Sequence, residues 1–339
     1  MKLAVLPGDG IGPEVVGATM PLLERLAPLE VTELDWGSDR WLRTGAGMPA
    51  DAVETVREHD AVLFGAVGRP DVPQDVPVWG IILKLRQALD LYVNLRPVTS
   101  WAGIEGPLRD GANVDFVVVR ENTEGEYAGI GGRSHAGTAD EVAIEVAVHT
   151  RRAIERVARF AFELASRRRG LVSLVTKSNA SRFGYPLWDE VVREVADAHP
   201  DVRVEQVFVD AMAARMIERP RSLDVLLCSN LFGDILSDLG APLQGGLGMA
   251  PSANIRPGGG APGLFEPVHG SAPDIAGKGI ANPCGCILSA ALMLRELGDA
   301  DAAAQLEQAV GRAVRHTRTP DLGGEATTAQ LAAAVAGEL

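Results

Sequence analysis

Two aspartates lie four residues apart in an otherwise apolar segment. Asp234 and Asp238 belong to the run from Asn230 to Asp238, and their spacing places both carboxylates on one face of a helix. Hard divalent cations such as Mg²⁺ and Mn²⁺ prefer carboxylate oxygens and retained water as ligands. A solvated helix face has the same spacing, so this pattern alone leaves a metal site and a structural role equally open.

Three arginines are expected at the ends of secondary-structure elements. Arg86 is predicted on a helix, Arg96 on the strand that follows it, and Arg120 at the end of an apolar strand. A planar guanidinium group matches a carboxylate with two parallel hydrogen bonds, so these arginines are candidates for binding an acidic substrate. Each one taken alone is more typical of a structural ion pair.

Tyr127 and Lys177 are candidates for proton transfer. Lys177 follows the predicted strand Leu171–Thr176, and ligand sites of α/β proteins form at the carboxyl ends of strands. Desolvated beside cations, a lysine loses its proton more readily and acts as a base. An ordinary structural lysine is the commoner case when no other residue is considered.

A glycine-rich turn follows the first strand. Gly8, Gly10 and Gly12 are spaced too closely for the GxGxxG fingerprint, so a Rossmann dinucleotide site is not indicated. Amides at a helix N-terminus bind anions, but a purely structural turn is the more common use of such a segment.

Apolar runs of strand length alternate with helical patterns along the chain, which predicts an α/β architecture. One predicted helix spans Glu141–Ser166, and the glycine-rich segment 128–140 before it is expected to form a loop or an arm. Pro97 and the Gly- and Pro-rich segment 240–263 resemble crossings between two lobes. The first and last thirds of the chain are therefore expected to share one lobe.

Composition excludes several classes of protein. The 339 residues are 46% hydrophobic and carry a formal net charge of -13, which disfavours nucleic-acid binding. The one dense basic cluster, Arg151–Arg169, is predicted to be the solvated face and C-terminal end of a helix. Three cysteines are too few for a disulfide framework, and no membrane span or signal peptide is recognisable, so we expect a cytoplasmic protein.

Six motifs, in order and suitably spaced, resemble the isocitrate/isopropylmalate dehydrogenase family of β-decarboxylating dehydrogenases. They are Pro7–Glu14, Leu85-Arg86 with Asn94–Pro97, Arg120–Tyr127, Thr176–Asn179, Asn230–Asp238 and Phe265–Lys278. The resemblance implies a two-lobed α/β fold that is not a Rossmann fold and has a cleft between its lobes. Residues 1–96 and 243–339 would form the cofactor-binding lobe, and residues 97–242 the substrate and dimerisation lobe with an arm near 128–150.

The resemblance also implies roles for the candidate residues. Arg86, Arg96 and Arg120 would bind the substrate carboxylates, and Ile82 and Leu83 would contact the rest of the substrate. Asp234 and Asp238, with Asp210 of the second subunit of a homodimer, would hold Mg²⁺ or Mn²⁺. Lys177, also from that subunit, would be the base, and Tyr127 the acid that protonates C3. The metal would act as a Lewis acid during loss of CO₂.

The cofactor implied by the resemblance is NAD, with K⁺ as a further candidate. Asp274-Ile275 stand where relatives that use NAD place an acidic residue on the adenosine ribose and where relatives that use NADP place Lys-Tyr. A carboxylate there binds the ribose diol and repels a 2′-phosphate. The other positions that match the cofactor site are Ile11, Asn179, His269, Gly270, Ala272 and Asn282.

The substrate is less well defined than the reaction. Val78 stands where isopropylmalate enzymes usually carry a glutamate, while the aliphatic Ile81, Ile82 and Leu83 remain. Several motifs are closer to the D-malate/tartrate branch, which we favour, with 3-isopropylmalate or another 3-substituted malate as the alternatives. A non-catalytic regulatory subunit would have lost the lysine, the tyrosine or an aspartate, and all of them are present. A nucleic-acid-binding protein would need a recognition module, and none is recognisable.

Overall fold

The computed structural model describes residues 1–73, 75–108 and 113–339, which form two compact units. The first unit comprises Met1–Leu91, Leu95–Val114 and Gly240–Leu339, and the second comprises Tyr92–Asn94 and Asp115–Leu239. The segment 97–114 thus lies in the first unit, although we expected the second lobe to begin at residue 97. The cofactor and substrate roles expected of the two lobes stay predictions.

Mostly parallel strands form the sheet of the first unit. Their order is β2 (Glu30–Glu33), β1 (Lys2–Gly8), β3 (Ala61–Ala66), β12 (Gly263–Pro267), β11 (Pro251–Ile255) and β4 (Val93–Thr99). β1 pairs in parallel with β2 and β3, and β12 pairs in parallel with β3, whereas β11 runs antiparallel to β12. β1 and β3 are rich in buried aliphatic residues, as is typical of parallel strands covered on both faces.

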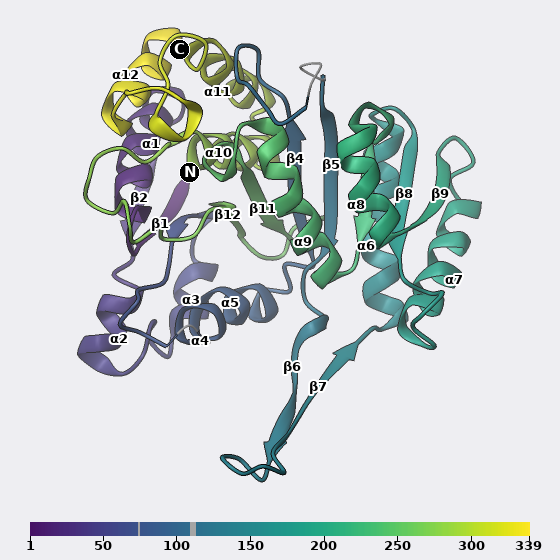
Figure 1. Ribbon diagram of the computed structural model, residues 1–339. Helices are drawn as coiled ribbons and strands as arrows, with labels where there is room; N and C mark the ends of the chain where they lie inside the picture. Colours follow the sequence, from purple (N-terminus) through teal and green to yellow (C-terminus); the bar gives the residue numbers. More distant parts are fainter. Residues whose placement is uncertain (74, 109–112) are drawn as a thin grey trace. The chain divides into compact units, whose positions relative to one another are not determined.

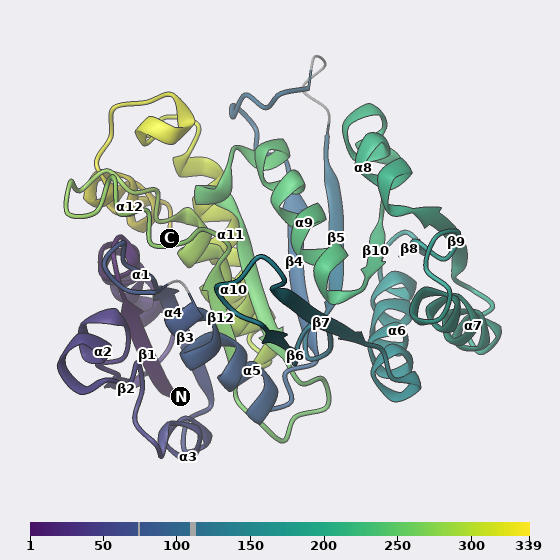
Figure 2. The same cartoon turned by 60° about the horizontal axis from the view of Figure 1, so that its bottom comes forward.

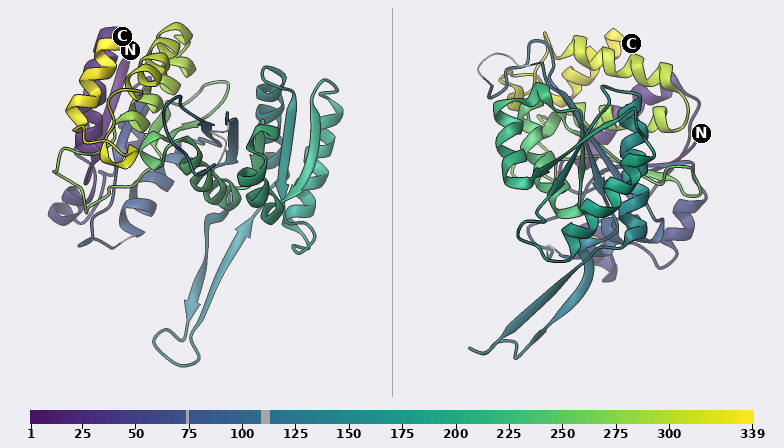
Figure 3. Two further views of the ribbon diagram at one scale, coloured as in Figure 1. Left: turned by 45° about the horizontal axis from the view of Figure 1, so that its top comes forward. Right: turned by 90° about the vertical axis from the view of Figure 1, so that its right-hand side faces the viewer.

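The longer helices of the first unit pack beside this sheet. They are α1 (Gly12–Leu26), α2 (Ser38–Thr44), α3 (Ala52–Arg57), α5 (Leu83–Ala88), α10 (Cys284–Glu296), α11 (Ala300–Ala313) and α12 (Thr328–Glu338). α10 is buried along nearly its whole length and lies against β11 and β12 (Figure 2). α12 packs against α1, and the left view of Figure 3 shows the yellow C-terminal helix beside the purple N-terminal segment. The three cysteines are buried and form no disulfide, as the sequence predicts.

Short helical segments complete the first unit. They are α4 (Asp75–Pro77), the π-helix η1 (Val78–Ile82), and the 3-10 helices η3 (Ala241–Gln244), η4 (Leu247–Met249) and η5 (Pro320–Leu322). η1 continues directly into α5, the helix that carries Arg86. Single π-helical turns within longer helices are frequently found at functional sites.

The turn after β1 is closely packed. A Cβ atom at Gly8 would lie 1.9 Å from the carbonyl oxygen of Ala66, and one at Gly10 would lie 2.0 Å from that of Ser271. Both glycines have positive φ, which they adopt at little cost. The amide of Ile11 donates to the carbonyl of Ser271 at 2.9 Å, so the turn ties α1 to the segment after β12.

Four parallel strands form the sheet of the second unit (Figure 1). Their order is β5 (Asp115–Glu121), β10 (Val225–Cys228), β8 (Leu171–Thr176) and β9 (Arg203–Phe208). The helical segments of this unit are α6 (Arg151–Ser166), α7 (Gly184–Asp197), α8 (Val209–Glu218), the 3-10 helix η2 (Pro220–Ser222) and α9 (Asn230–Gly240). α6 and α7 pack against each other and against strands of the sheet. The expected alternation of strands and helices is confirmed.

A hairpin of β6 (Gly125–Ser134) and β7 (Val142–Val148) extends away from the rest of the second unit (Figure 1). The predicted helix over 141–166 was therefore wrong in its first part, because α6 begins only at Arg151. Residues 142–148 alternate branched aliphatic side chains with Ala or Glu, a period of two that favours a strand. Ile130, Val142, Ile144 and Val146 are exposed on this hairpin.

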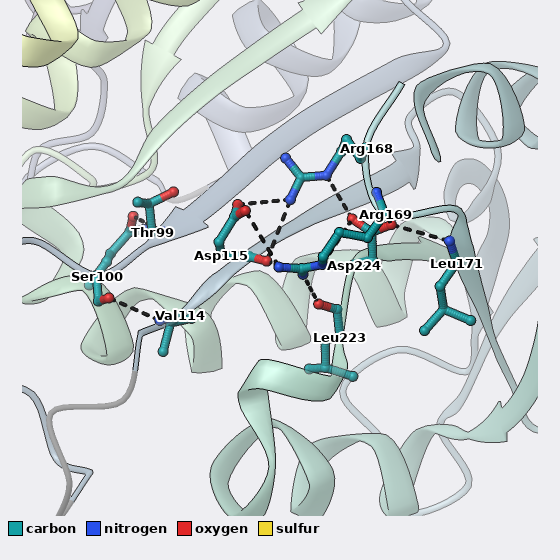
Figure 4. Close-up of polar contacts among 10 residues, drawn as sticks. Thr99, Ser100, Val114, Asp115, Arg168, Arg169, Leu171, Leu223 and Asp224 are labelled. Carbon is teal, nitrogen blue, oxygen red and sulfur yellow. Dashed lines mark hydrogen bonds and ion pairs between the residues drawn. The ribbon is translucent and has the colours of Figure 1, made fainter. Parts of the chain in front are cut away.

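The basic end of α6 is not simply a solvated face. Nε of Arg168 donates to Oδ1 of Asp224 at 2.8 Å, and the amides of Arg169 and Leu171 donate to Oδ2 (Figure 4). Asp224 is only 1% exposed, and Arg168 also donates to Oδ1 of Asp115 at 2.8 Å. These contacts hold the C-terminal end of α6 to the beginnings of β5, β8 and β10 (Figure 4).

Candidate active site

Arg120, Tyr127 and Asp234 form one hydrogen-bonded group in the second unit. Nη1 of Arg120 donates to Oδ1 of Asp234 at 2.5 Å, and the hydroxyl of Tyr127 donates to Oδ2 at 3.0 Å. The guanidinium carbon of Arg120 also lies 5.6 Å from the centre of the Tyr127 ring, within the range of a cation–π contact. The structure therefore brings together three of the residues that the sequence singled out.

Asn230 and Gly233, the first turn of α9, position this group. Oδ1 of Asn230 accepts from Nε of Arg120 at 2.8 Å, and its Nδ2 donates to the carbonyl of Glu124 at 2.8 Å. A Cβ atom at Gly233 would lie 2.6 Å from Cβ and Cγ of Arg120, so only glycine lets the buried arginine lie against the helix. We gave neither residue a role from the sequence. The signal was available, since a buried arginine needs several acceptors.

The surroundings of Tyr127 keep its hydroxyl protonated. Burial raises the pKa of this phenol, and the negative charge of Asp234 raises it further, although the nearby Arg120 acts in the opposite direction. A neutral tyrosine hydroxyl is a hydrogen-bond donor that can serve as a general acid.

Lys177 and Asp210 form an ion pair with Nζ 3.0 Å from Oδ1. β8 and β9 are parallel, with Thr176 paired to Phe208, so the residues that follow the two strands meet at one edge of the sheet. The hydrogen bond from Lys177 is the main reason why the pKa of Asp210 is lowered. The side chain of Asp210 is 70% exposed, which leaves it accessible to a further ligand.

Asp234 and Asp238 offer the oxygen ligands that a hard divalent cation requires. Both lie on α9, and both are at least partly exposed. Within the described residues, no group of three or more His, Cys, Asp or Glu side chains is close enough to hold a metal ion. The two carboxylates of α9 therefore fit the expected cation chemically, while the described part of this chain groups no third carboxylate with them.

Arg86 lies in the first unit in a buried ion pair. Its Nη2 donates to Oε1 of Glu266 at 2.7 Å, and Nδ2 of Asn254 donates to the same oxygen at 2.8 Å. Nε of Arg86 is shielded from solvent and has no hydrogen-bond partner among the described residues. Glu266, to which we gave no role, thus holds the guanidinium group. Arg96, on β4, is also buried, at 7% exposure.

Ile82 and Leu83 lie where the π-helix passes into α5. Ile82 packs against the core cluster that includes Ile81, Leu85 and Phe64, and Leu83 is 5% exposed. By contrast, Val78 and Trp79 at the start of η1 are more than 40% exposed. The expected substrate contacts of Ile82 and Leu83 stay predictions.

The expected NAD-binding residues of the first unit cluster around the segment after β12. Nδ1 of His269 lies 2.9 Å from the carbonyl oxygen of Gly270, while its Nε2 is shielded from solvent and has no partner among the described residues. Burial lowers the pKa of His269, so the ring is neutral near pH 7. An unsatisfied imidazole nitrogen fits a hydrogen bond to a bound cofactor.

The other expected NAD-binding residues differ in their exposure and in their hydrogen bonds. Ala272 has a φ of 40°, and its carbonyl accepts from the amide of Ile275 at 3.1 Å. Asp274 is exposed, so its carboxylate is available to a ligand. Asn282 is buried and donates to Oδ2 of Asp321 at 3.0 Å. Asn179 belongs to the second unit, where it is exposed just after Lys177.

The chain is similar to known dehydrogenases along nearly its whole length. The family model described as isocitrate/isopropylmalate dehydrogenase matches residues 2–335. A probable tartrate dehydrogenase/decarboxylase of Agrobacterium vitis is 48% identical over 98% of this chain and 96% of its own. A 3-isopropylmalate dehydrogenase of Thermobifida fusca is also 48% identical, over 98% of this chain and 95% of its own.

A solved structure has the same fold. The crystal structure of isocitrate dehydrogenase from Methylococcus capsulatus has a TM-score of 0.92 and 39% identity, and the match covers 99% of this chain and 98% of that one. The fold class predicted from the sequence is therefore confirmed. Among the described residues, no helix has the length and apolar character needed to cross a membrane.

Proposed function

Because the chain belongs to the isocitrate/isopropylmalate dehydrogenase family, we propose that it oxidises and decarboxylates a malate-type 2-hydroxy acid of the D-malate/tartrate kind. The family consists of oxidative decarboxylating dehydrogenases. The observation that carries the proposal is the group of Arg120, Tyr127 and Asp234. In this group a guanidinium able to bind a carboxylate, a protonated hydroxyl and a candidate metal ligand lie within hydrogen-bond distance, which supports the proposal.

The proposed reaction assigns one task to each of these residues. Arg120, with Arg86 and Arg96, binds the substrate carboxylates. Lys177 takes up the proton of the substrate hydroxyl, for which its amine form is required. After the bond between C3 and the departing CO₂ breaks, Tyr127 donates its proton to C3. When bound, NAD⁺ supplies a hydride acceptor for C2, and Mg²⁺ or Mn²⁺ held by Asp234 and Asp238 supplies charge stabilisation at the substrate oxygens.

We also propose that the active enzyme is a homodimer with sites shared between subunits. The hairpin β6–β7 exposes four branched aliphatic side chains, and Ile217 on α8 and Ile235 on α9 are exposed as well. A group of exposed branched aliphatic side chains is typical of a surface that binds another protein chain. The partner subunit is then the source of the third carboxylate, Asp210, and of Lys177.

Substrate choice is the least constrained part of the proposal. The relative named for tartrate and the relative named for 3-isopropylmalate are equally similar to this chain. Val78, which replaces the glutamate usual in isopropylmalate enzymes, favours the D-malate/tartrate kind. 3-Isopropylmalate, or a malate with another C3 substituent, is the second candidate.

A substrate panel tests the proposal. NADH formation would be followed with D-malate, L-tartrate, 3-isopropylmalate and isocitrate in the presence of Mg²⁺ or Mn²⁺, with and without K⁺ and EDTA. We expect the highest kcat/KM with D-malate or L-tartrate, and loss of turnover in EDTA. A preference of about tenfold or more for 3-isopropylmalate would establish the second candidate instead. Absence of turnover with all four acids would contradict the proposed substrate class.

A further inference from the structure

The first unit contains a pocket that shares no residue with the candidate active site. Its volume is about 530 Å³, and it lies between the end of β4, the 3-10 helix η3 and the helices α10 and α11. Binding sites for small organic molecules span about 300–1,000 Å³, so this pocket is of suitable size. Its apolar lining includes Pro97, Pro251, Leu288 and Leu292, the last two one turn apart on α10.

Trp101 forms an aromatic wall of this pocket. A Cβ atom at Gly311 of α11 would lie 3.2 Å from Cζ3 of the indole ring, so the glycine allows the ring to lie close against the helix. The indole N–H, on the opposite edge of the ring, is shielded from solvent and has no acceptor among the described residues. A buried donor without an acceptor costs free energy.

The charged residues at the pocket differ in whether they are paired. Glu307 forms two hydrogen bonds of 2.8 Å with Arg295, and Arg312 binds the carboxylate of Glu338 at 2.7 Å. Arg315 is exposed and has no carboxylate partner in the described part of the chain. The pocket therefore combines apolar walls with one unpaired cation.

We propose that this pocket binds a small monocarboxylate with an aromatic or branched aliphatic body. The body packs between Trp101, Leu288 and Leu292, and the carboxylate pairs with Arg315. The buried amide of Gln244, whose Oε1 accepts from the amide of Thr99 at 3.3 Å, adds a polar edge. D-malate and tartrate have no apolar body to bury there, so the ligand class differs from the favoured substrates.

Calorimetric titration of the purified protein with naphthalene-1-acetate tests this site. We expect saturable binding with a Kd between about 10 µM and 1 mM, as is reasonable for a ligand of this size. Arg315→Gln should weaken binding about tenfold. Arg193→Gln, which changes an exposed arginine on α7 of the second unit, should leave binding unchanged. The neutral naphthalene-1-acetamide should bind about tenfold more weakly than the acid.

A second variant tests the position of the ligand without disturbing the core. Ala102 is exposed and lines the pocket, so Ala102→Trp should obstruct it and abolish binding. An unchanged melting temperature would show that the variant is folded. The proposal is wrong if no binding is detected up to about 10 mM, or if both Arg315→Gln and Ala102→Trp bind normally. Displacement of the acid by D-malate would also overturn it, because the ligand would then occupy the substrate site.

Discussion

The hydroxyl of Tyr127 donates to Oδ2 of Asp234 across 3.0 Å, and Arg120 donates to the other oxygen of the same carboxylate. Asp234 is therefore the acceptor for an acid and a cation at once, and it is also a proposed metal ligand. The side chain of Asp234 keeps 35% of its surface exposed, so a cation can reach it.

The first prediction concerns Asp234→Asn. The amide keeps nearly the shape of the carboxylate but removes a negative charge, so binding of Mn²⁺ should weaken and kcat/KM should fall at least about a hundredfold. Metal binding is measured by calorimetry and turnover by NADH formation. Asp197→Asn, an exposed change at the end of α7, is the control and should retain both. Normal metal binding by Asp234→Asn would remove α9 from the proposed metal site.

The second prediction is a preference for NAD over NADP of about tenfold or more in kcat/KM. Asp274 is exposed, and in the proposed cofactor site its carboxylate would bind the ribose diol and repel a 2′-phosphate. Asp274→Lys combined with Ile275→Tyr should shrink or reverse the preference. Equal use of both cofactors by the unmodified enzyme would contradict the role of Asp274.

The third prediction is complementation between two inactive variants. Lys177→Ala and Tyr127→Phe should each lose activity, and the two should recover about a quarter of the normal activity when refolded together. Random association makes half of the dimers mixed, and one of the two sites in each mixed dimer carries neither change. Refolding each variant alone is the control. If demonstrably mixed dimers stay inactive, each site lies within one chain.

Most of the fold follows from local sequence, but the contacts of the candidate site do not. The alternation of apolar runs predicted the strands and helices. The spacing of Asp234 and Asp238 predicted that both residues lie on one helix. The hydrogen bonds to Asp234 join residues more than 100 positions apart, so no local pattern reveals them. The strand Val142–Val148 was missed because its alternating pattern was merged with that of the helix after it.

The fourth prediction is a loss of stability below pH 6.5. Burial lowers the pKa of His149 and of His269 from the usual 6.5, although Glu126 and Glu124 act in the opposite direction on His149, and Asp321 and Glu266 on His269. Each neutral ring therefore contributes stability that is complete above pH 6.5 and is lost as the pH falls through its lowered pKa. The slope is at most about 1.4 kcal/mol per pH unit for each histidine.

Urea unfolding between pH 7.5 and pH 5 measures this dependence. In His149→Gln the free energy of unfolding should change less steeply with pH than in the unmodified protein. The same change at His316, which is exposed on the surface, is the control and should leave the slope as it is. Equal slopes for the unmodified protein and His149→Gln would show that His149 does not titrate in this range.

The fifth prediction is that Asp224→Asn destabilises the second unit by about 2–4 kcal/mol. The change leaves Arg168 beside an uncharged partner and weakens the bonds from the amides of Arg169 and Leu171. Asp201→Asn, at an exposed position before β9, should cost less than about 0.5 kcal/mol. Urea unfolding compares the two variants, and equal midpoints would refute a structural role for the buried carboxylate.

Tyr127 and the exposed residue Ile130 belong to the same strand, β6, and the register of the hairpin shifts between Gly125 and Ile130. The position of the Tyr127 side chain therefore depends on the position of the C-terminal part of β6. In the proposed homodimer the aliphatic face of the hairpin lies against the second subunit, so loss of the subunit contact would free the strand that carries Tyr127 without any change at the substrate. A compound that competed with the subunit contact would therefore inhibit noncompetitively with respect to the hydroxy acid.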